Sequence, residues 1–224
     1  MKPGAFGPRL IARYYAARDL RVSIEGGEYL PRRGPALLAC RHFHHLYDGA
    51  ALIDALPRKP AVMVALDWAK DATTRRVMEL ACKLADWPVV LRADGLAAGS
   101  SAFAPDETFG YVRRGLAHGA DLLRRGELLV VFPEAYPTID PAAARKSDEQ
   151  AFLPFRGGVL TLVSLAQRGD ALRVPILPVG LSYVREGRRW HVTIRLDAPR
   201  YLEGRAERGA LLADLATRVR ALSA

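Results

Sequence analysis

Four short runs of uninterrupted apolar residues constrain the fold of this chain more than any other feature. They are ALLAC at 36–40, AVMVAL at 61–66, PVVL at 88–91 and LLVVF at 128–132. Apolar runs this short, without alternating polar residues, are typical of strands that are buried on both faces. Such strands belong to a sheet that helices cover on both sides, so we expect a fold of the α/β class.

Segments with helical periodicity separate these runs. We expect helices at 46–56, 71–85, 107–125, 157–168 and 207–222, the second with Val77, Leu80, Ala81 and Leu84 on one face. Further strands are expected at 21–25, 174–183 and 190–196. A chain of 224 residues can bury one complete core, and no linker divides it. The sequence therefore predicts a single α/β domain with a mixed, mostly parallel sheet flanked by helices.

The N-terminal segment, 5–20, also has helical periodicity. Its apolar stripe consists of Phe6, Leu10, Tyr14 and Ala17. Arginines lie beside this stripe, so two interpretations stay open: a helix that lies on a membrane surface, or an ordinary first helix packed on its own domain. We divide the chain into an N-terminal amphipathic helix, 1–20, and an α/β domain, 21–224.

The charge of the chain narrows the class of its partners. Lys and Arg number 33 against 24 Asp and Glu, which gives a net charge of +9. This surplus favours anionic lipid surfaces, acidic carrier proteins or nucleic acid. We expect no nucleic acid, because no known nucleic-acid-binding motif occurs. No apolar run approaches the ~20 residues that span a bilayer, and no signal-peptide stretch is present. We expect a cytoplasmic protein associated peripherally with the inner face of the membrane.

Three of the five histidines cluster directly after the first buried run. They are His42, His44 and His45, and Asp48 follows. A carboxylate on one ring nitrogen fixes the tautomer of a histidine and raises its basicity. His44 lies four residues from Asp48, and His42 could fold back onto it. Two other interpretations are a plain helix N-terminus and a metal site. Because no second group of ligands has complementary spacing, we expect neither a metal nor a cofactor.

The two cysteines, Cys40 and Cys82, lie in apolar surroundings. We interpret them as buried thiols of a protein in a reducing compartment.

Other polar residues follow strands later in the chain. Pro133 and Glu134 end the run at 128–132, Arg92 ends PVVL, and Arg156 and Gly157 precede a predicted helix. Ligands gather at the carboxyl ends of strands in α/β sheets, and helix N-termini favour anions. Each of these residues, taken singly, is equally compatible with solvated surface.

Read in order, these segments resemble the glycerolipid acyltransferase superfamily, typified by lysophosphatidate and glycerol-3-phosphate acyltransferases. That family carries an N-H-x-S-x-x-D block, a strand ending in Arg, and F-P-E-G-T-R-S, P-F-K-x-G and V-P-V-x blocks. The corresponding blocks here are RHFHHLYD (41–48), WPVVLR (87–92), VVFPEAYP (130–137), LPFRGG (153–158) and VPILPVG (174–180). The resemblance covers roughly residues 15–185, and its strength lies in the order of the five blocks.

The chain departs from the family pattern in its first block. The family places five steps between His and Asp, whereas His42 is six and His44 four residues from Asp48. Anchored on the strand, the family His corresponds to His42 with a one-residue bulge, which we favour. Anchored on the helix, the substitute is His44, and His45 takes the place of the helix-capping Ser.

The third block departs as well. FPEAYP stands in place of F-P-E-G-T-R-S, so Tyr136 or Pro137 occupies the position of the family Arg that faces an acceptor phosphate. Residues that could replace this charge are Arg92, Arg145, Lys146 and Arg156. Tyr136 would offer a flat amphipathic surface, which favours a larger acceptor such as a lysophospholipid.

The resemblance implies O-acyl transfer from a thioester, acyl-CoA or acyl carrier protein, to a lysophospholipid-type acceptor. The default acceptor is 1-acylglycerol-3-phosphate, in phospholipid biosynthesis. A histidine of the cluster takes the hydroxyl proton and Asp48 orients it, while Glu134 and Arg92 position the acceptor headgroup. Pro133, Arg156 and Gly157 complete the expected substrate-binding set. No G-x-S-x-G motif occurs, so we expect direct transfer without an acyl-enzyme. The alternative is a catalytically impaired module that binds lipid at a membrane surface.

Overall fold

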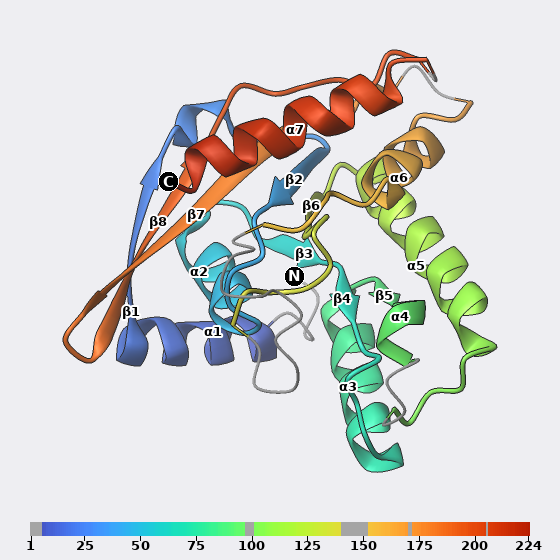
Figure 1. Ribbon diagram of the computed structural model, residues 1–224, viewed down its shortest axis with the longest axis horizontal. Coiled ribbons are helices and arrows are strands. Elements are labelled where there is room, and N and C mark those ends of the chain that lie inside the picture. The colour runs from blue at the N-terminus through green and yellow to red at the C-terminus, as the bar shows by residue number, and fades with distance from the viewer. Residues whose placement is uncertain (1–5, 97–100, 140–151, 170–171, 205) are drawn as a thin grey trace.

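The computed structural model describes residues 6–96, 101–139, 152–169, 172–204 and 206–224 (Figure 1). The helices are α1 (Phe6–Asp19), the 3-10 turn η2 (Gly27–Tyr29), α2 (Tyr47–Ala55), α3 (Ala72–Ala85), α4 (Ala93–Leu96), α5 (Glu107–Arg124), α6 (Gly158–Ala166) and α7 (Arg208–Leu222). The strands are β1 (Leu20–Glu25), β2 (Ala36–Cys40), β3 (Pro60–Val62), β4 (Val64–Ala65), β5 (Val89–Val90), β6 (Leu128–Val131), β7 (Ile176–Glu186) and β8 (Arg189–Leu196).

Six strands form the main sheet in the order β1-β8-β7-β2-β6-β3. All neighbouring pairs are parallel except β7 with β8, which are joined as an antiparallel hairpin. The apolar runs at 36–40 and 128–131 form the buried centre, β2 beside β6. This confirms the predicted α/β class with a mostly parallel sheet flanked by helices.

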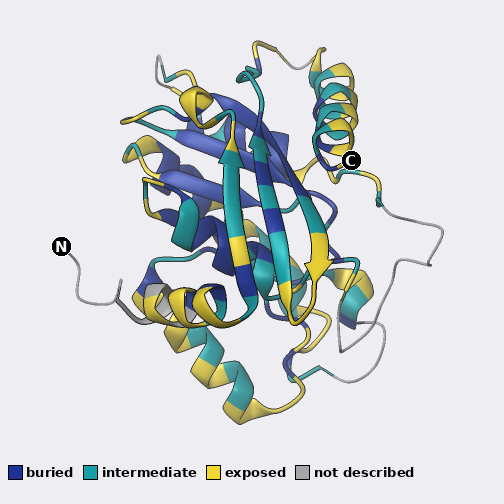
Figure 2. Cartoon of the chain, turned by 90° about the vertical axis from the view of Figure 1, so that its left-hand side faces the viewer, coloured by how far each residue is buried: buried dark blue, intermediate teal, exposed yellow. Residues whose placement is uncertain are grey.

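Helices cover both faces of this sheet, and the pleat sends alternate residues of each strand to opposite cores. Leu38 and Cys40 of β2 point to the core that α1 and α2 close. Leu37 and Ala39 point to the other core, which α5, α6 and α7 close. Figure 1 shows α7 lying across the strands, and Figure 2 shows burial concentrated in the centre of the sheet.

A smaller unit stands beside β3. The run at 61–66, expected to be one strand, divides: the amide of Met63 donates to the carbonyl of Val130 in the main sheet, and the amide of Val64 to that of Pro88. The chain thereby leaves one sheet and starts another, the parallel pair β4-β5. An apolar run cannot reveal this switch, because both halves are equally apolar. Gly115 lets α5 approach β5, since a Cβ there would lie 2.4 Å from the carbonyl oxygen of Val89.

The apolar face predicted for α3 points to solvent. Val77, Leu80 and Leu84 are 59%, 57% and 59% exposed. The helix packs instead through its other side, where Cys82 and Ala85 are buried.

Helix α1 behaves in the same way. Leu10 and Tyr14 of the predicted stripe are 61% and 58% exposed, while the small residues Ala12 and Ala16 are buried in the core. The helix therefore packs on its own domain and also presents Leu10 and Tyr14 outward, while its contact with a membrane surface stays a prediction. None of the helices in the described part of the chain is long and apolar enough to cross a membrane.

Candidate active site

The first block lies where β2 ends, between β6 and β7. The segment that follows β6 runs alongside it: the amide of Thr138 donates to the carbonyl of His42 and that of Ile139 to the carbonyl of Phe43, at 3.2 and 2.7 Å. Blocks ninety residues apart in the sequence thus share one edge of the sheet, as expected for the carboxyl ends of parallel strands.

His42 and Asp48 are in direct contact. Nδ1 of His42 lies 2.9 Å from Oδ2 of Asp48, and the imidazole stacks on Phe132 with 4.3 Å between ring centroids. The side chain of Asp48 is 1% exposed and that of His42 is 14% exposed. A carboxylate at Nδ1 places the proton of the neutral ring on Nδ1, which leaves the lone pair on Nε2 to accept a proton.

Asp48 is buried, and both of its oxygens have donors. Oδ2 accepts from the amide of Phe43 at 2.7 Å, and the amide of His44 lies 3.1 Å from each oxygen. The hydroxyl of Tyr183 on β7 donates to Oδ1 at 2.6 Å. Burial, followed by the Asp48 charge, raises the pKa of Tyr183 well above its usual value, so the phenol remains a donor. Two segments of the chain, residues 42–44 and β7, therefore fix this carboxylate.

His44 occupies a structural position at the start of α2. Its Nδ1 accepts from the amides of Leu46 and Tyr47 at 3.2 and 3.3 Å, and its ring stacks on Tyr47. Its ring therefore caps amides at the start of α2, although Leu46 is the N-cap residue. The helix-anchored alignment gave the capping place to His45. The His42 imidazole contacts Asp48, as the strand-anchored alignment requires, and the identity of the base stays a prediction.

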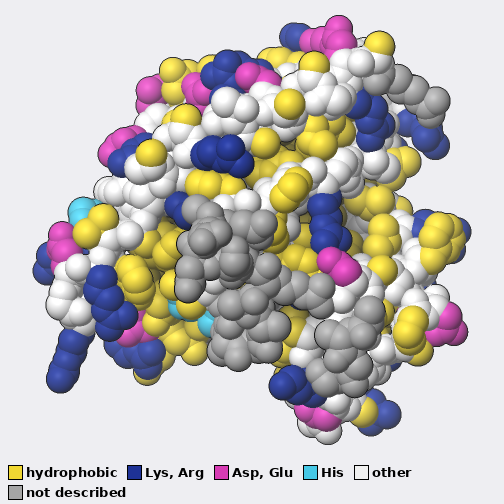
Figure 3. All heavy atoms as spheres, viewed as in Figure 1, with side chains coloured by type: hydrophobic (Ala, Val, Ile, Leu, Met, Phe, Trp, Pro, Cys, Tyr) yellow, Lys and Arg dark blue, Asp and Glu magenta, His cyan; other side chains and the backbone are white. Residues whose placement is uncertain are grey.

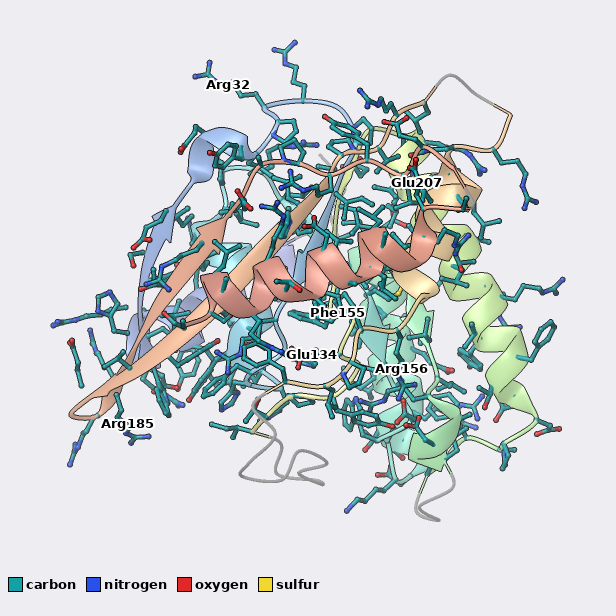
Figure 4. The ribbon with its side chains drawn as sticks, turned by 45° about the horizontal axis from the view of Figure 1, so that its top comes forward. Arg32, Glu134, Phe155, Arg156, Arg185 and Glu207 are labelled. Atoms are coloured by element: carbon teal, nitrogen blue, oxygen red, sulfur yellow. The ribbon has the colours of Figure 1, made fainter. Side chains whose placement is uncertain are left out.

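Glu134 is 1% exposed and binds backbone amides on both sides. Oε1 accepts from the amide of His42, and Oε2 from that of Leu153, each at 2.9 Å. The carbonyl of Pro133 accepts from the amide of Arg156 at 2.9 Å, so the third and fourth blocks lie side by side (Figure 4). Glu134 thereby ties the His42 backbone to the fourth block, and its role at the acceptor headgroup stays a prediction.

Arg92 is committed to a buried ion pair. Its Nη2 lies 2.8 Å from Oδ2 of Asp67, its Nε donates to both oxygens of that carboxylate, and its Nη1 donates to the carbonyl of Ala135 at 2.6 Å. The side chains of Arg92 and Asp67 are 11% and 2% exposed. Ala135 has a left-handed φ of 67° at the position of the family glycine.

Tyr136 is 5% exposed and therefore does not form the open surface that the sequence suggested. The guanidinium of Arg92 lies 4.0 Å from its ring centroid and that of Arg156 5.5 Å. Arg156 in turn binds Asp94 at 2.7 Å, and these two side chains are 48% and 43% exposed. Arg156 is thus the more accessible of the two arginines. Gly157 directly precedes α6, where a Cβ would meet open space. Arg145 and Lys146 lie outside the described residues.

A third arginine, Arg41, was not singled out from the sequence. It is 8% exposed, and its Nη1 donates to the carbonyls of Leu181 and Ser223 at 3.0 and 3.2 Å. Its guanidinium lies over the ring of Phe43, 5.0 Å from the centroid. Burial lowers the pKa of Arg41, while the charges of Glu134 and Asp48 oppose that shift. The site thus contains a buried cation between buried carboxylates.

Tyr183 and Asp67 were missed as well. Each had a signal of the kind used for Glu134, a polar side chain at the end of an apolar run. Among the described residues, no group of three or more His, Cys, Asp or Glu is arranged to hold a metal ion. Burial raises the pKa of the Cys40 thiol well above its usual value, which disfavours the reactive thiolate.

Comparisons with known proteins agree with this fold. A 1-acyl-sn-glycerophosphate acyltransferase from Thermotoga maritima, PlsC, has a similar structure, with a TM-score of 0.57 and 17% identity over 97% of this chain and 79% of that chain. A search of curated proteins found no match. The model of the family described as Acyltransferase matches residues 21–182. Because this match spans well over half of the sequence, the chain belongs to the acyltransferase family.

Proposed function

We propose that this acyltransferase transfers a fatty acyl group from a thioester, acyl-CoA or acyl carrier protein, to a hydroxyl of a lysophospholipid-type acceptor. The observation that carries the proposal is the contact of His42 Nδ1 with Asp48 Oδ2 at 2.9 Å, which leaves Nε2 as the basic nitrogen. The default acceptor is 1-acylglycerol-3-phosphate, the substrate class named for the Thermotoga maritima enzyme of similar fold.

In this proposal His42 is the general base and Asp48 is its positioning residue. Nε2 accepts the acceptor hydroxyl proton while the oxygen attacks the thioester carbonyl, and Asp48 stabilises the resulting imidazolium. When the tetrahedral intermediate collapses, the C–S bond breaks, and the departing thiolate takes the proton from Nε2 of the imidazolium. No acyl-enzyme is required, and the raised pKa of the buried Cys40 thiol is consistent with direct transfer.

The remaining residues receive different roles. Glu134 holds the His42 backbone amide in place, the Pro133 carbonyl joins the third block to the fourth, and Gly157 begins α6. Arg156, the accessible arginine beside the site, contacts the acceptor headgroup. Arg92 shapes this region through Asp67 and is not the contact for the acceptor phosphate.

We further propose that the N-terminal helix, 1–20, associates with the membrane surface and that 21–224 is the catalytic domain. The exposed Leu10 and Tyr14 support this placement. Deleting the helix would be an unsuitable test, because Ala12 and Ala16 belong to the core. Replacing Leu10 and Tyr14 by Ser tests the contact while Ala12 and Ala16 keep the helix packed on the core.

The experiment for the proposed activity follows thiol release from a long-chain acyl-CoA, with and without 1-acylglycerol-3-phosphate. His42→Ala and Asp48→Asn should each lower transfer at least ~10²-fold, the contribution of a positioned base. His44→Ala is the matched control: it should keep activity within a few-fold and cost about 1 kcal/mol of stability through the lost cap. Acceptor-dependent release that survives His42→Ala and disappears in His44→Ala would overturn the assignment of the base. Absence of release with every acyl donor and acceptor would favour a lipid-binding module.

A further inference from the structure

The outward face of α3 is apolar, and no other element in the described part of the chain covers it. Val77, Leu80 and Leu84 follow one another at helical spacing and are each more than half exposed. Three large aliphatic side chains on one exposed stripe are more than the scattered apolar residues of an ordinary surface. Trp68, just before the helix, is 41% exposed as well.

The charges around this stripe are positive. Arg76 and Lys83 are exposed on α3 next to it. The carboxylate of the helix interior, Glu79, lies on the inner side, where it accepts from the hydroxyl of Tyr111 on α5 and pairs with Arg75. The exposed carboxylate of Asp71 lies at the start of the helix, before the stripe begins. Aliphatic residues flanked by cations fit a surface whose headgroups are anionic and whose interior is apolar.

The position of α3 in the molecule supports the same partner. In Figures 1 and 2, α1 and α3 lie at the same end of the molecule. Strand β2 runs toward that end and leads directly into His42. The carboxyl edge of the sheet, which carries the site, is therefore directed toward the end of the molecule where α1 and α3 lie. On the face of the molecule drawn in Figure 3, Lys and Arg side chains are spread among acidic and apolar ones and form no single groove.

We propose that α3 is a membrane-contact helix that binds an anionic lipid bilayer through Val77, Leu80 and Leu84, with Arg76 and Lys83 on the headgroups. Together with α1 it orients the site toward the bilayer, because two separate contacts fix a plane where one helix would allow rotation. The inference rests on the proposed function in one respect, that the acceptor is a lipid held in this bilayer.

A second copy of the chain is a poorer occupant of the face. Pairing two such faces would bring the exposed cations Arg76 and Lys83 of one copy near the same residues of the other. Like charges placed together oppose association. Anionic headgroups remove this repulsion, which is why the bilayer is favoured.

The test compares Leu80→Glu/Leu84→Glu with Tyr29→Glu. Tyr29 is 40% exposed as well, but it lies in η2, which follows the end of β1 that is distant from α1. Sedimentation with phosphatidylglycerol–phosphatidylethanolamine vesicles and with phosphatidylcholine vesicles, in the absence of acyl donor, measures the partition coefficient. We expect the double variant to bind the anionic vesicles at least ~10-fold more weakly and the control to bind within twofold of the wild type. Unchanged binding by the double variant would overturn the proposal.

A second variant, Arg76→Gln/Lys83→Gln, keeps the apolar stripe and does not depend on placing charge there. It should weaken binding to the anionic vesicles several-fold and leave phosphatidylcholine binding unchanged.

If the wild type, in the absence of vesicles, sediments as a dimer that Leu80→Glu/Leu84→Glu dissociates, the face belongs to a second copy and the proposal is wrong. Because binding is measured without acyl transfer, a protein that binds vesicles through α3 yet transfers no acyl group would overturn only the proposed function.

Discussion

Tyr183 and Asp48 are 135 residues apart in the sequence, and the tyrosine hydroxyl donates to the buried carboxylate at 2.6 Å. The contact joins β7 to the start of α2 across the strand that carries His42. It supplies a side-chain donor to Asp48 in addition to the His42 contact. The orientation of the His42–Asp48 pair therefore depends on a residue of a distant strand.

The first prediction concerns this hydrogen bond. Tyr183→Phe removes the hydroxyl but keeps the ring that stacks on Phe43, 4.5 Å between centroids. A hydrogen bond to a charged group contributes about 1.5–3 kcal/mol, so we expect stability to fall by about that amount. We expect kcat to fall roughly tenfold with KM unchanged, because Asp48 is less well oriented. Steady-state kinetics and urea unfolding measure both quantities.

Tyr47→Phe is the matched control for this variant. Its hydroxyl donates to another carboxylate, Oδ2 of Asp19, at 3.0 Å. This bond lies outside the His42–Asp48 contact, so the control should keep kcat. Equal loss of kcat in both variants would show that the effect is a general one of lost hydroxyl groups.

The second prediction concerns the strained backbone at Ala135, whose φ is 67°. A non-glycine residue in the left-handed region destabilises the folded state by roughly 1–2 kcal/mol. Glycine removes this cost, but its greater freedom stabilises the unfolded chain and offsets part of the gain. Ala135→Gly should therefore raise the free energy of unfolding by up to about 1 kcal/mol, measured by urea denaturation. Ala81→Gly, in the exposed part of α3, should lower it by about 1 kcal/mol. A clear loss of stability in Ala135→Gly would contradict the strain argument.

The third prediction concerns alkaline pH. Burial raises the pKa of the Cys82 thiol from 9.0 to about 11. Between these two pH values the folded state keeps a proton that the unfolded state has lost. The contribution of the protonated thiol to the free energy of unfolding is therefore complete below pH 9 and is lost as the pH rises to about 11. The loss amounts to about 2–3 kcal/mol, since one pKa unit corresponds to about 1.4 kcal/mol. Urea unfolding under reducing conditions at pH 8 and pH 11 should show a smaller decline for Cys82→Ala. An equal fall in the free energy of unfolding for the wild type and Cys82→Ala would contradict this assignment.

How far the sequence predicts this molecule differs between its parts. Continuous apolar runs identified β2 and β6, because a strand buried on both faces leaves no room for polar residues. The block order placed His42, Asp48 and Glu134 together, since blocks at the ends of parallel strands converge on one edge. The partition of 61–66 between two sheets could not be predicted, because hydrophobicity does not record which neighbour a strand binds.

Partners distant in sequence account for the rest. The sequence presents Arg92 as a free cation at the end of a strand, and only the fold reveals Asp67 beside it. Likewise the periodicity of α1 and α3 identifies an apolar face correctly but cannot state whether protein covers it. In both helices, small residues that carry little hydrophobic signal, such as Ala16 and Ala85, make the contact with the core.

The last prediction separates the two arginines near the site. Arg92→Ala leaves the carboxylate of Asp67, 2% exposed, without its cation, and breaking a buried pair costs about 3–5 kcal/mol. Arg156→Gln removes a half-exposed partner of Asp94, where such pairs contribute at most about 1 kcal/mol. We therefore expect a large fall in the melting temperature for Arg92→Ala only.

If Arg156 binds the acceptor phosphate, Arg156→Gln should raise KM for 1-acylglycerol-3-phosphate about tenfold at constant kcat, since charge-assisted contacts to phosphate are strong. Competition between this acceptor and lysophospholipids with a diester headgroup supplies the control, because the diester carries less charge for Arg156 to bind. A wild-type preference for the diester acceptors, unaltered in Arg156→Gln, would contradict both the default acceptor and the role of this arginine.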